Sequence, residues 1–303
     1  MTIATLINFC SNEYRFLWDS IKEVKKFSHT IIVSVSDHFF DGKKEDPLLL
    51  NAIFQEFPDV KFLLFPFFPG PFFGKRKETL HYWHNAGRML GFAHLPKEIE
   101  YVLFLDADEI PDGDHFQAFL QKYPIHKYDF LKLYCYWYFR EPRFQAKTWE
   151  TSPLFAKRSA INRKLIMQKE ERSGMFTQGK GQKLEGILGL EEKPMVHHYS
   201  WVRTKNEMLK KVRSWGHAKD RDWESLVEKE FSEEFQGRDF VHGYEFITVD
   251  PFISPIYTTP QAPLSPSLSH VHKITPKELS STLFGPYKGF FKSLRKNLST
   301  RDD

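Results

Sequence analysis

The chain has 303 residues, and its composition suits a folded enzyme rather than a nucleic-acid-binding protein. A chain of this length can bury a large core, and its 30 Phe, 12 Tyr and 7 Trp provide bulky side chains to fill it. The net charge is +4, and residues 251–303 alone hold seven Lys or Arg against three acidic residues. The first 250 residues therefore have no basic excess with which to bind nucleic acid.

The sequence also carries predictions about location. No run of about 18 apolar residues occurs, and the N-terminus lacks the basic region of a secretory signal. Cys10 and Cys135 are too few for a disulfide framework. We therefore expect a cytoplasmic protein in which both cysteines are buried thiols.

In chain order, the predicted elements alternate between strand and helix. A strand, a helix and a strand fill residues 3–36, and the later segments are a helix at 48–57, a strand at 60–65, a helix at 78–94 and strands beginning at Tyr101 and at Phe130. The segment from Pro66 to Gly74 holds three Pro and two Gly, so we expect a loop there, whose four Phe would cover a nucleotide site. The alternation predicts an α/β fold with a mostly parallel sheet and right-handed crossovers.

Two carboxylates, Asp106 and Asp108, follow the buried strand that begins at Tyr101. They should lie at the carboxyl edge of the sheet, where ligands bind in open α/β folds. Alternate carboxylates on emerging chain are hard oxygen ligands for Mg²⁺ or Mn²⁺, which in turn would hold a diphosphate. Capping of the strand end is the structural alternative, because Asp is common in turns.

A hydrophobic strand followed by Asp-x-Asp is typical of two reaction classes. One is phosphoryl transfer with Asp106 as an aspartyl nucleophile, and the other is sugar transfer from a nucleotide-sugar, in which the metal neutralises the diphosphate leaving group. Phosphatases of the haloacid dehalogenase superfamily are expected to have Thr or Val where this chain has Ile110. A metal-dependent phosphohydrolase remains the alternative to a transferase, as does a non-catalytic nucleotide-binding protein.

Several segments resemble GT-A fold, family 2-like glycosyltransferases. Residues 4–21 are similar to the first strand and helix of that family, and residues 82–94 to the helix that precedes Asp-x-Asp. The Asp-Ala-Asp-Glu-Ile-Pro motif at 106–111 is similar to that of the bisecting N-acetylglucosaminyltransferases. Residues 195–217 look like the His-Tyr-x-Trp segment and helix of some lipopolysaccharide-core and N-acetylglucosaminyl transferases. Together these matches cover roughly residues 4–220.

The resemblance implies a GT-A-like, Rossmann-like fold in three parts. Residues 1–130 would bind the nucleotide-sugar, residues 131–250 would bind the acceptor and close the site, and residues 251–303 would form a proline-rich segment and a basic aromatic tail. The implied activity is metal-dependent, inverting transfer of a hexosyl or N-acetylhexosaminyl group to a glycan or glycolipid. The implied donor is a nucleotide-diphosphate sugar, UDP-sugar ahead of GDP-sugar, with Mn²⁺ or Mg²⁺.

The resemblance also implies roles for individual side chains. Asp106, Asp108 and His198 would hold the metal, and His197 should point to the opposite face because strand neighbours alternate. Residues expected to contact the donor are Asn8, Asp37, Asn85, Arg88, Asp106 and Lys211. For Arg88 and Lys211 the alternative is a solvated position on a helix. The Arg that usually precedes Asn in the family is His84 here, which leaves that role open.

Two further predictions concern the acceptor half and the tail. An inverting transferase needs a carboxylate base at the acceptor hydroxyl, and Glu150 and Glu185 are the candidates. Residues 284–303 mix Phe and Leu with Lys and Arg, which predicts peripheral contact with an anionic membrane surface. A terminal helix docked through its aromatic side chains is the alternative for this tail.

Overall fold

The computed structural model describes residues 1–39, 42–67, 76–214, 221–254 and 268–284. The predicted membrane-contacting tail lies outside these residues apart from Phe284, and so does most of the predicted loop from Pro66 to Gly74. Within the described ranges, no helix is long and apolar enough to cross a membrane.

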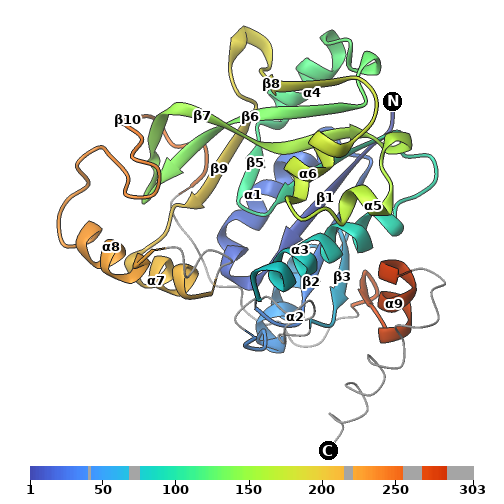
Figure 1. The fold of residues 1–303 in the computed structure, drawn as a ribbon, viewed down its shortest axis with the longest axis horizontal. Helices are drawn as coiled ribbons and strands as arrows, with labels where there is room; N and C mark the ends of the chain where they lie inside the picture. Colours follow the sequence, from blue (N-terminus) through green and yellow to red (C-terminus); the bar gives the residue numbers. More distant parts are fainter. Residues whose placement is uncertain (40–41, 68–75, 215–220, 255–267, 285–303) are drawn as a thin grey trace, which may run out of the picture.

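Five parallel strands form the first half of the sheet (Figure 1). Their spatial order is β11 (Val271–Lys273), β3 (Lys61–Phe65), β2 (Thr30–Ser36), β1 (Ile3–Phe9) and β4 (Tyr101–Asp106). Each neighbouring pair in this series is parallel. Among all strand pairings of the described residues, six are parallel and four antiparallel, which confirms the predicted mostly parallel α/β sheet.

Helices cover both faces of this parallel half because successive strand residues point to opposite sides. Ile3 and Ile7 of β1 join an apolar core on one face, whose helices are α1 (Tyr14–Val24), α2 (Pro47–Glu56) and α4 (Gly113–Lys122). Ala4 and Leu6 join the core on the other face, whose helices are α3 (Arg76–Ala93), α5 (Arg163–Ile166), α6 (Glu171–Gln178) and α9 (Pro276–Phe284). The predicted helices at 48–57 and 78–94 are thus confirmed as α2 and α3.

The second half of the sheet is mainly antiparallel. The long strand β7 (Glu141–Lys157) pairs with β4, and the order continues through β6 (Phe130–Phe139), β9 (Val196–Trp201) and β5 (Glu109–Pro111). The short strands β8 (Lys183–Ile187) and β10 (Phe246–Thr248) pair with β6 and β7. One sheet therefore spans both predicted halves, and β6 begins at the predicted boundary.

Two helices, α7 (Lys205–Ser214) and α8 (Trp223–Glu230), pack against the end of the second half through an aromatic core that includes Trp201 and Trp223. Four single-turn 3₁₀ helices complete the described elements, at Ser11–Glu13, Ile125–Lys127, Arg158–Ala160 and Leu190–Glu192. Lys210 and Lys211 of α7 line the same cavity as Asn8 and Phe9 of β1, so α7 lies near the carboxyl edge of the parallel strands.

Candidate active site

A cavity of about 620 Å³ opens at the carboxyl edge of β1, β2 and β4. Its floor includes Asn8 from the end of β1, with Asp106 beside it at the end of β4 in the paired register. Its opposite wall comes from β9 and α7. The charged and imidazole side chains that line it are those of Glu13, Arg15, His38, His84, Asp106, Asp108, His198, Arg203, Glu207, Lys210 and Lys211.

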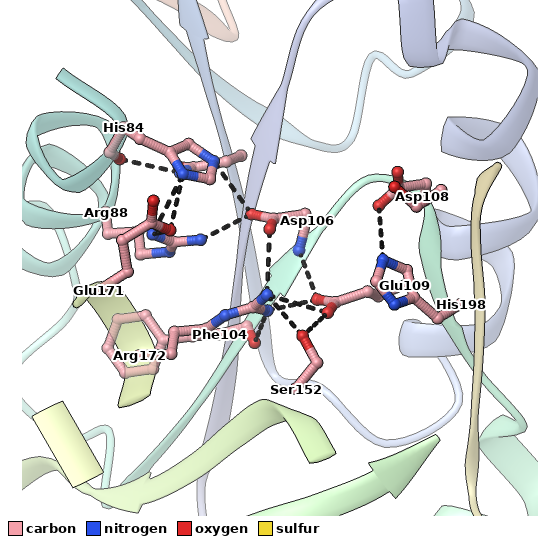
Figure 2. Close-up of polar contacts among 12 residues, drawn as sticks. His84, Arg88, Phe104, Asp106, Asp108, Glu109, Ser152, Glu171, Arg172 and His198 are labelled. Carbon is pink, nitrogen blue, oxygen red and sulfur yellow. Dashed lines mark hydrogen bonds and ion pairs between the residues drawn. The ribbon is translucent and has the colours of Figure 1, made fainter. Parts of the chain in front are cut away.

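Asp106 reaches this cavity but is held by cationic side chains on both oxygens (Figure 2). Arg88 donates from Nη2 to Oδ1 at 2.8 Å, and Arg172 donates from Nη2 to Oδ2 at 3.0 Å. Burial disfavours the charged form of Asp106, but Arg172 and Arg88 outweigh it and hold the pKa of this carboxyl well below its usual range. An attacking nucleophile would have to leave both ion pairs, which argues against the phosphohydrolase alternative.

Glu109 fixes the chain between the two aspartates. This carboxylate is fully buried, and its oxygens accept from the backbone N–H of Asp106 at 2.9 Å and from the hydroxyl of Ser152 at 2.5 Å. Arg172 donates to both oxygens of Glu109 and to the carbonyl of Phe104 at 3.2 Å. The motif is therefore a rigid turn rather than a solvated loop.

The carboxylate of Glu171, on α6, completes this ion network. Glu171 accepts from Arg88 at 2.8 Å, and its oxygens lie 2.8 Å from Nδ1 of both His81 and His84. His84 also lies 3.3 Å from Oδ1 of Asp106 through Nε2. Burial opposes the charged form of His84, but the two carboxylates raise its pKa to about 9. His84 thus stands beside Asp106 as a cation, where the resembling family has Arg.

Asp108 is placed quite differently from Asp106. Its side chain is 8% exposed, and its Oδ1 lies 3.8 Å from Nε2 of His198 (Figure 2). The antiparallel register of β5 and β9 causes this proximity, because Glu109 pairs with His198 and Tyr199 N donates to the Asp108 carbonyl at 2.8 Å. Burial, with the nearby Glu13 carboxylate, raises the pKa of Asp108 to about 6. An oxygen and a nitrogen donor therefore face one point of the cavity.

His197 and His198 point to opposite faces of β9, as predicted from strand alternation. His197 is buried, its Nδ1 lies 2.7 Å from the Tyr138 hydroxyl, and its ring stacks on Phe252 at 4.1 Å. Burial lowers its pKa to about 3, so it packs as a neutral ring. His198 instead lines the cavity, and within the described part of the chain its Nδ1 has no hydrogen-bond partner.

Cationic side chains gather on the α7 side of the cavity. Arg203 is buried and donates to both oxygens of Glu13 at 2.6 Å, with Nη2 4.0 Å from Oδ2 of Asp108. Lys211 donates to the Ser200 hydroxyl at 2.9 Å, and burial together with the nearby Arg203 lowers its pKa. The sequence had singled out Lys211, whereas Arg203 carries no motif of its own.

Of the other residues expected at the donor, Asn8 lines the cavity and Asp37, Asn85 and Arg88 do not. Asn8 donates to the carbonyl of His84 at 2.9 Å, and a Cβ on Gly87 would meet its Oδ1 at 2.9 Å, so a glycine lets α3 approach β1 this closely.

The three residues outside the cavity position their neighbours. Asp37 accepts from the Phe67 N–H at 2.7 Å and lies 2.6 Å from Nδ1 of His38, which does line the cavity. Asn85 donates to the Gln168 carbonyl at 2.6 Å. Asp37, Asn85 and Arg88 therefore bind neighbouring parts of the protein and hold the site in place.

The two candidate bases also lie outside the cavity lining. Glu185 accepts from Lys132 at 2.9 Å and from Thr151 at 3.1 Å, and its side chain is 50% exposed. Glu150 lies 3.7 Å from Nε2 of His242. Apart from the two aspartates, the carboxylates lining the cavity are Glu13, paired with Arg203, and Glu207, paired with Arg15.

No protein-family model and no curated protein matches this sequence. Solved structures show distant likeness, among them the 4-diphosphocytidyl-2C-methyl-D-erythritol synthase of Anaerococcus prevotii (11% identity, 61% of this chain and 89% of that chain, TM-score 0.36). Others are the catalytic domain of Drosophila β1,4-galactosyltransferase 7 with xylobiose (12%, 77% and 82%, 0.37) and S. aureus TarS 1–349 (9%, 81% and 98%, 0.39).

Proposed function

We propose that this chain is a GT-A-like glycosyltransferase that binds a nucleotide-diphosphate sugar with a divalent metal ion in the cavity at the sheet edge. The observation that carries the proposal is the facing pair of Asp108 Oδ1 and His198 Nε2, 3.8 Å apart on the wall of that cavity. A cavity at the carboxyl ends of parallel strands is the usual ligand site of such sheets. The proposed chemistry is transfer of a hexosyl or N-acetylhexosaminyl group to a glycan or glycolipid acceptor.

The residues present fit a metal ion at Asp108 and His198. One carboxylate oxygen and one imidazole nitrogen suit Mn²⁺ when diphosphate oxygens and water complete the shell, and they suit Mg²⁺ less well because Mg²⁺ prefers oxygen ligands. Burial and the nearby Glu13 carboxylate raise the pKa of Asp108, and a metal ion at this carboxylate would offset both effects. Asp106 is already neutralised by Arg88 and Arg172, so we assign the direct ligands to Asp108 and His198. When bound, the metal would stabilise the charge of the diphosphate leaving group.

The protein supplies further positive charge close to Asp108 and His198. Lys211 and Lys210 extend from α7 into the cavity lining, and Arg203 lies between Glu13 and Asp108. A diphosphate bound against His198 and Asp108 would therefore also meet ammonium groups, which offset the charge that the metal leaves uncovered. We propose Lys211 as the main diphosphate contact of the chain.

The nucleoside would occupy the end of the cavity nearest β2. There the lining is Ser34, Ser36 and His38 together with the aromatic rings of Phe9, Phe39 and Phe65. Asp37 is proposed to act through His38, whose ring it holds at 2.6 Å, and not by direct contact with the base or ribose. A UDP-sugar remains the first donor to test.

An inverting course would need a carboxylate base at the acceptor hydroxyl. Glu150 and Glu185 lie outside the cavity lining, and Glu185 is bound by Lys132, so neither is assigned that role here. If inversion is correct, exchange of the lining carboxylate Glu207 for Gln should lower kcat while donor affinity is retained. Unchanged kcat in that variant would exclude Glu207 as the base.

The proposed donor site is tested by calorimetric titration of UDP, GDP and their sugars with and without Mn²⁺. We expect one donor class to bind at least about tenfold more tightly with Mn²⁺, a difference of about 1.4 kcal/mol. Product analysis with glycan acceptors then tests transfer. Binding of phosphate or beryllofluoride to Asp106 as a covalent adduct, without nucleotide-sugar binding, would contradict the proposal.

Peripheral membrane contact by residues 284–303 is a separate proposal, which rests on the basic and aromatic composition of this segment. Sedimentation with anionic vesicles, comparing the full chain with one ending at residue 284, tests it. Equal binding by both chains would exclude the tail as the contact.

A further inference from the structure

Two imidazoles and a carboxylate meet at a place that contributes no residue to the cavity lining. They belong to His94, just after α3, to His272 in β11 and to Glu278 in the first turn of α9. Oε1 of Glu278 lies 3.0 Å from Nε2 of His94 and 2.8 Å from Nε2 of His272, and the three ligand atoms all lie within 4.8 Å of one another. Figure 1 shows α9 beside β3, the strand that pairs with the edge strand β11.

The hydrogen bonds of His94 show that this cluster needs a cation. Nδ1 of His94 lies 2.8 Å from the carbonyl oxygen of Leu90, which can only accept, so Nδ1 carries the proton. In the neutral ring Nε2 is then a bare lone pair, and it faces a carboxylate oxygen that is also an acceptor. Either a proton, carried by the ring or by the carboxyl group, or a metal ion must lie between them. A backbone carbonyl on Nδ1 with Nε2 turned to the ligand site is the usual support of a metal-binding His.

We propose that His94, His272 and Glu278 bind a divalent transition-metal ion, with Zn²⁺ as the best fit. Two imidazole nitrogens and one carboxylate oxygen are a Zn²⁺ donor set, and ligands about 2.0–2.2 Å from the ion would lie about 3.3–3.6 Å apart. Glu278 Oε1 lies 3.0 and 2.8 Å from the two Nε2 atoms, so small rotations of these side chains would admit the ion. The side chains of His94, His272 and Glu278 are 18%, 45% and 29% exposed. The site is therefore open to the solvent, which would supply a water as the fourth ligand.

The ion would link the C-terminal elements to the nucleotide-binding half. The edge strand β11 has only three residues and pairs with β3, while α9 packs on α3 through Leu279 and Leu283. His94 is contributed by the α3 side of this contact, and His272 and Glu278 by the two C-terminal elements. Metal binding would thus hold β11 and α9 in place by joining residues that are far apart in sequence. This inference does not depend on the proposed transferase activity.

The test is Co²⁺ and Zn²⁺ titration of the full chain carrying His198→Ala, which removes the other proposed metal ligand. We expect one Co²⁺ per chain, with visible absorption bands of nitrogen and oxygen ligation, and displacement by Zn²⁺. His94→Ala, His272→Ala and Glu278→Gln should each weaken binding at least tenfold. His270→Gln is the matched control, because it removes a His from the same segment, one whose Nε2 contacts the Phe54 carbonyl instead, and affinity should be unchanged.

Hydrogen exchange gives a second measurement that does not rely on the mutants folding well. In the parent chain, Zn²⁺ should slow exchange of backbone amides in β11 and α9, and in Glu278→Gln it should not. The proposal would be overturned if the chain carrying only His198→Ala bound neither Co²⁺ nor Zn²⁺, or if the three ligand substitutions left its metal affinity unchanged. Either result would identify the cation between His94 and Glu278 as a proton.

Discussion

Arg88 donates from Nη2 to Oδ1 of Asp106 at 2.8 Å while only 1% of the Arg88 side chain is exposed. The resemblance implied that Arg88 would meet the diphosphate, yet it lies beneath the cavity and uses its other nitrogen for Glu171 at 2.8 Å. Its function in this structure is to neutralise two carboxylates, and it thereby sets the conformation of the first Asp of the motif. The charge around Asp106 then decides which of the two aspartates is free to meet a metal.

Replacement of Arg88 should therefore act on stability. Arg88→Met leaves Asp106 and Glu171 buried with one cation fewer, and a broken buried ion pair typically costs about 3–5 kcal/mol of unfolding free energy. Urea denaturation measures this. Lys210→Met, which removes an exposed cation of the cavity lining, is the control and should change stability by less than about 0.5 kcal/mol. If the two variants have similar stabilities and only Arg88→Met loses donor binding, Arg88 contacts the diphosphate.

The two aspartates of the motif should respond differently to replacement by Asn. Asp108→Asn removes the proposed metal ligand and should abolish the Mn²⁺-dependent part of nucleotide binding, while the fold is kept because a buried carboxylate of raised pKa is replaced by a neutral group. Asp106→Asn should mainly lower stability, because it leaves Arg88 and Arg172 with a neutral partner. Calorimetry with UDP and Mn²⁺ alongside urea denaturation separates the two effects. Wild-type Mn²⁺-dependent affinity in Asp108→Asn would rule out the ligand assignment.

The adjacent histidines of β9 offer a matched pair of substitutions. His198→Ala should weaken metal-dependent diphosphate binding by about 1–3 kcal/mol, the usual effect of a lost ligating or charge-assisted contact. His197→Ala should instead reduce stability, because its ring stacks on Phe252 and its Nδ1 contacts the Tyr138 hydroxyl. Both variants are compared by nucleotide titration and by thermal unfolding. Equal loss of affinity in both variants, at unchanged stability, would contradict the assignment of His198 to the cavity and of His197 to the opposite face of β9.

Local periodicity explains what could be predicted from the sequence. A buried strand that ends in Asp106, and the opposite directions of His197 and His198, follow from the alternation of side chains along a strand. The meeting of Asp108 with His198 instead depends on the pairing of β5 with β9, and only the resemblance implied it. The predicted sheet and the helices α2 and α3 depend on such local patterns and on the rule that parallel strands share one carboxyl edge. These features are encoded within short stretches of the chain.

The partners of Asp106 could not be predicted because they depend on tertiary packing. Arg172 and Glu171 belong to α6, a short helix with no motif, and they reach the site only because α6 packs against the end of β7. Glu171 even has a positive φ of 54°, which no sequence pattern indicates. Glu185 likewise lies outside the cavity lining because β8 pairs with the first residues of β6, where Lys132 binds its carboxylate. Residue type alone therefore suggested that Arg88 binds the donor, whereas tertiary packing makes it an ion-pair partner of Asp106 and Glu171.

The raised pKa of His84 predicts a pH dependence of stability. The carboxylates of Glu171 and Asp106 outweigh burial and keep His84 protonated in the folded protein up to about pH 9, whereas in the unfolded chain it loses its proton near the ordinary value of 6.5. Between these values the folded state binds more protons, so its stability falls as pH rises. The contribution is complete below about pH 6.5 and lost by about pH 9. Its size is about 1–3 kcal/mol, since the partly exposed ring is screened by solvent.

His84→Gln should flatten this dependence. Unfolding free energies from urea denaturation at several values between pH 6.5 and 9 should decline with pH in the wild-type chain and decline less in the variant, by the same 1–3 kcal/mol over the whole interval. His126→Gln, at an exposed position, is the control and should keep the wild-type slope. If wild type and His84→Gln show parallel curves, the proton on His84 is not coupled to folding, and the cationic environment of Asp106 would consist of the two guanidiniums alone.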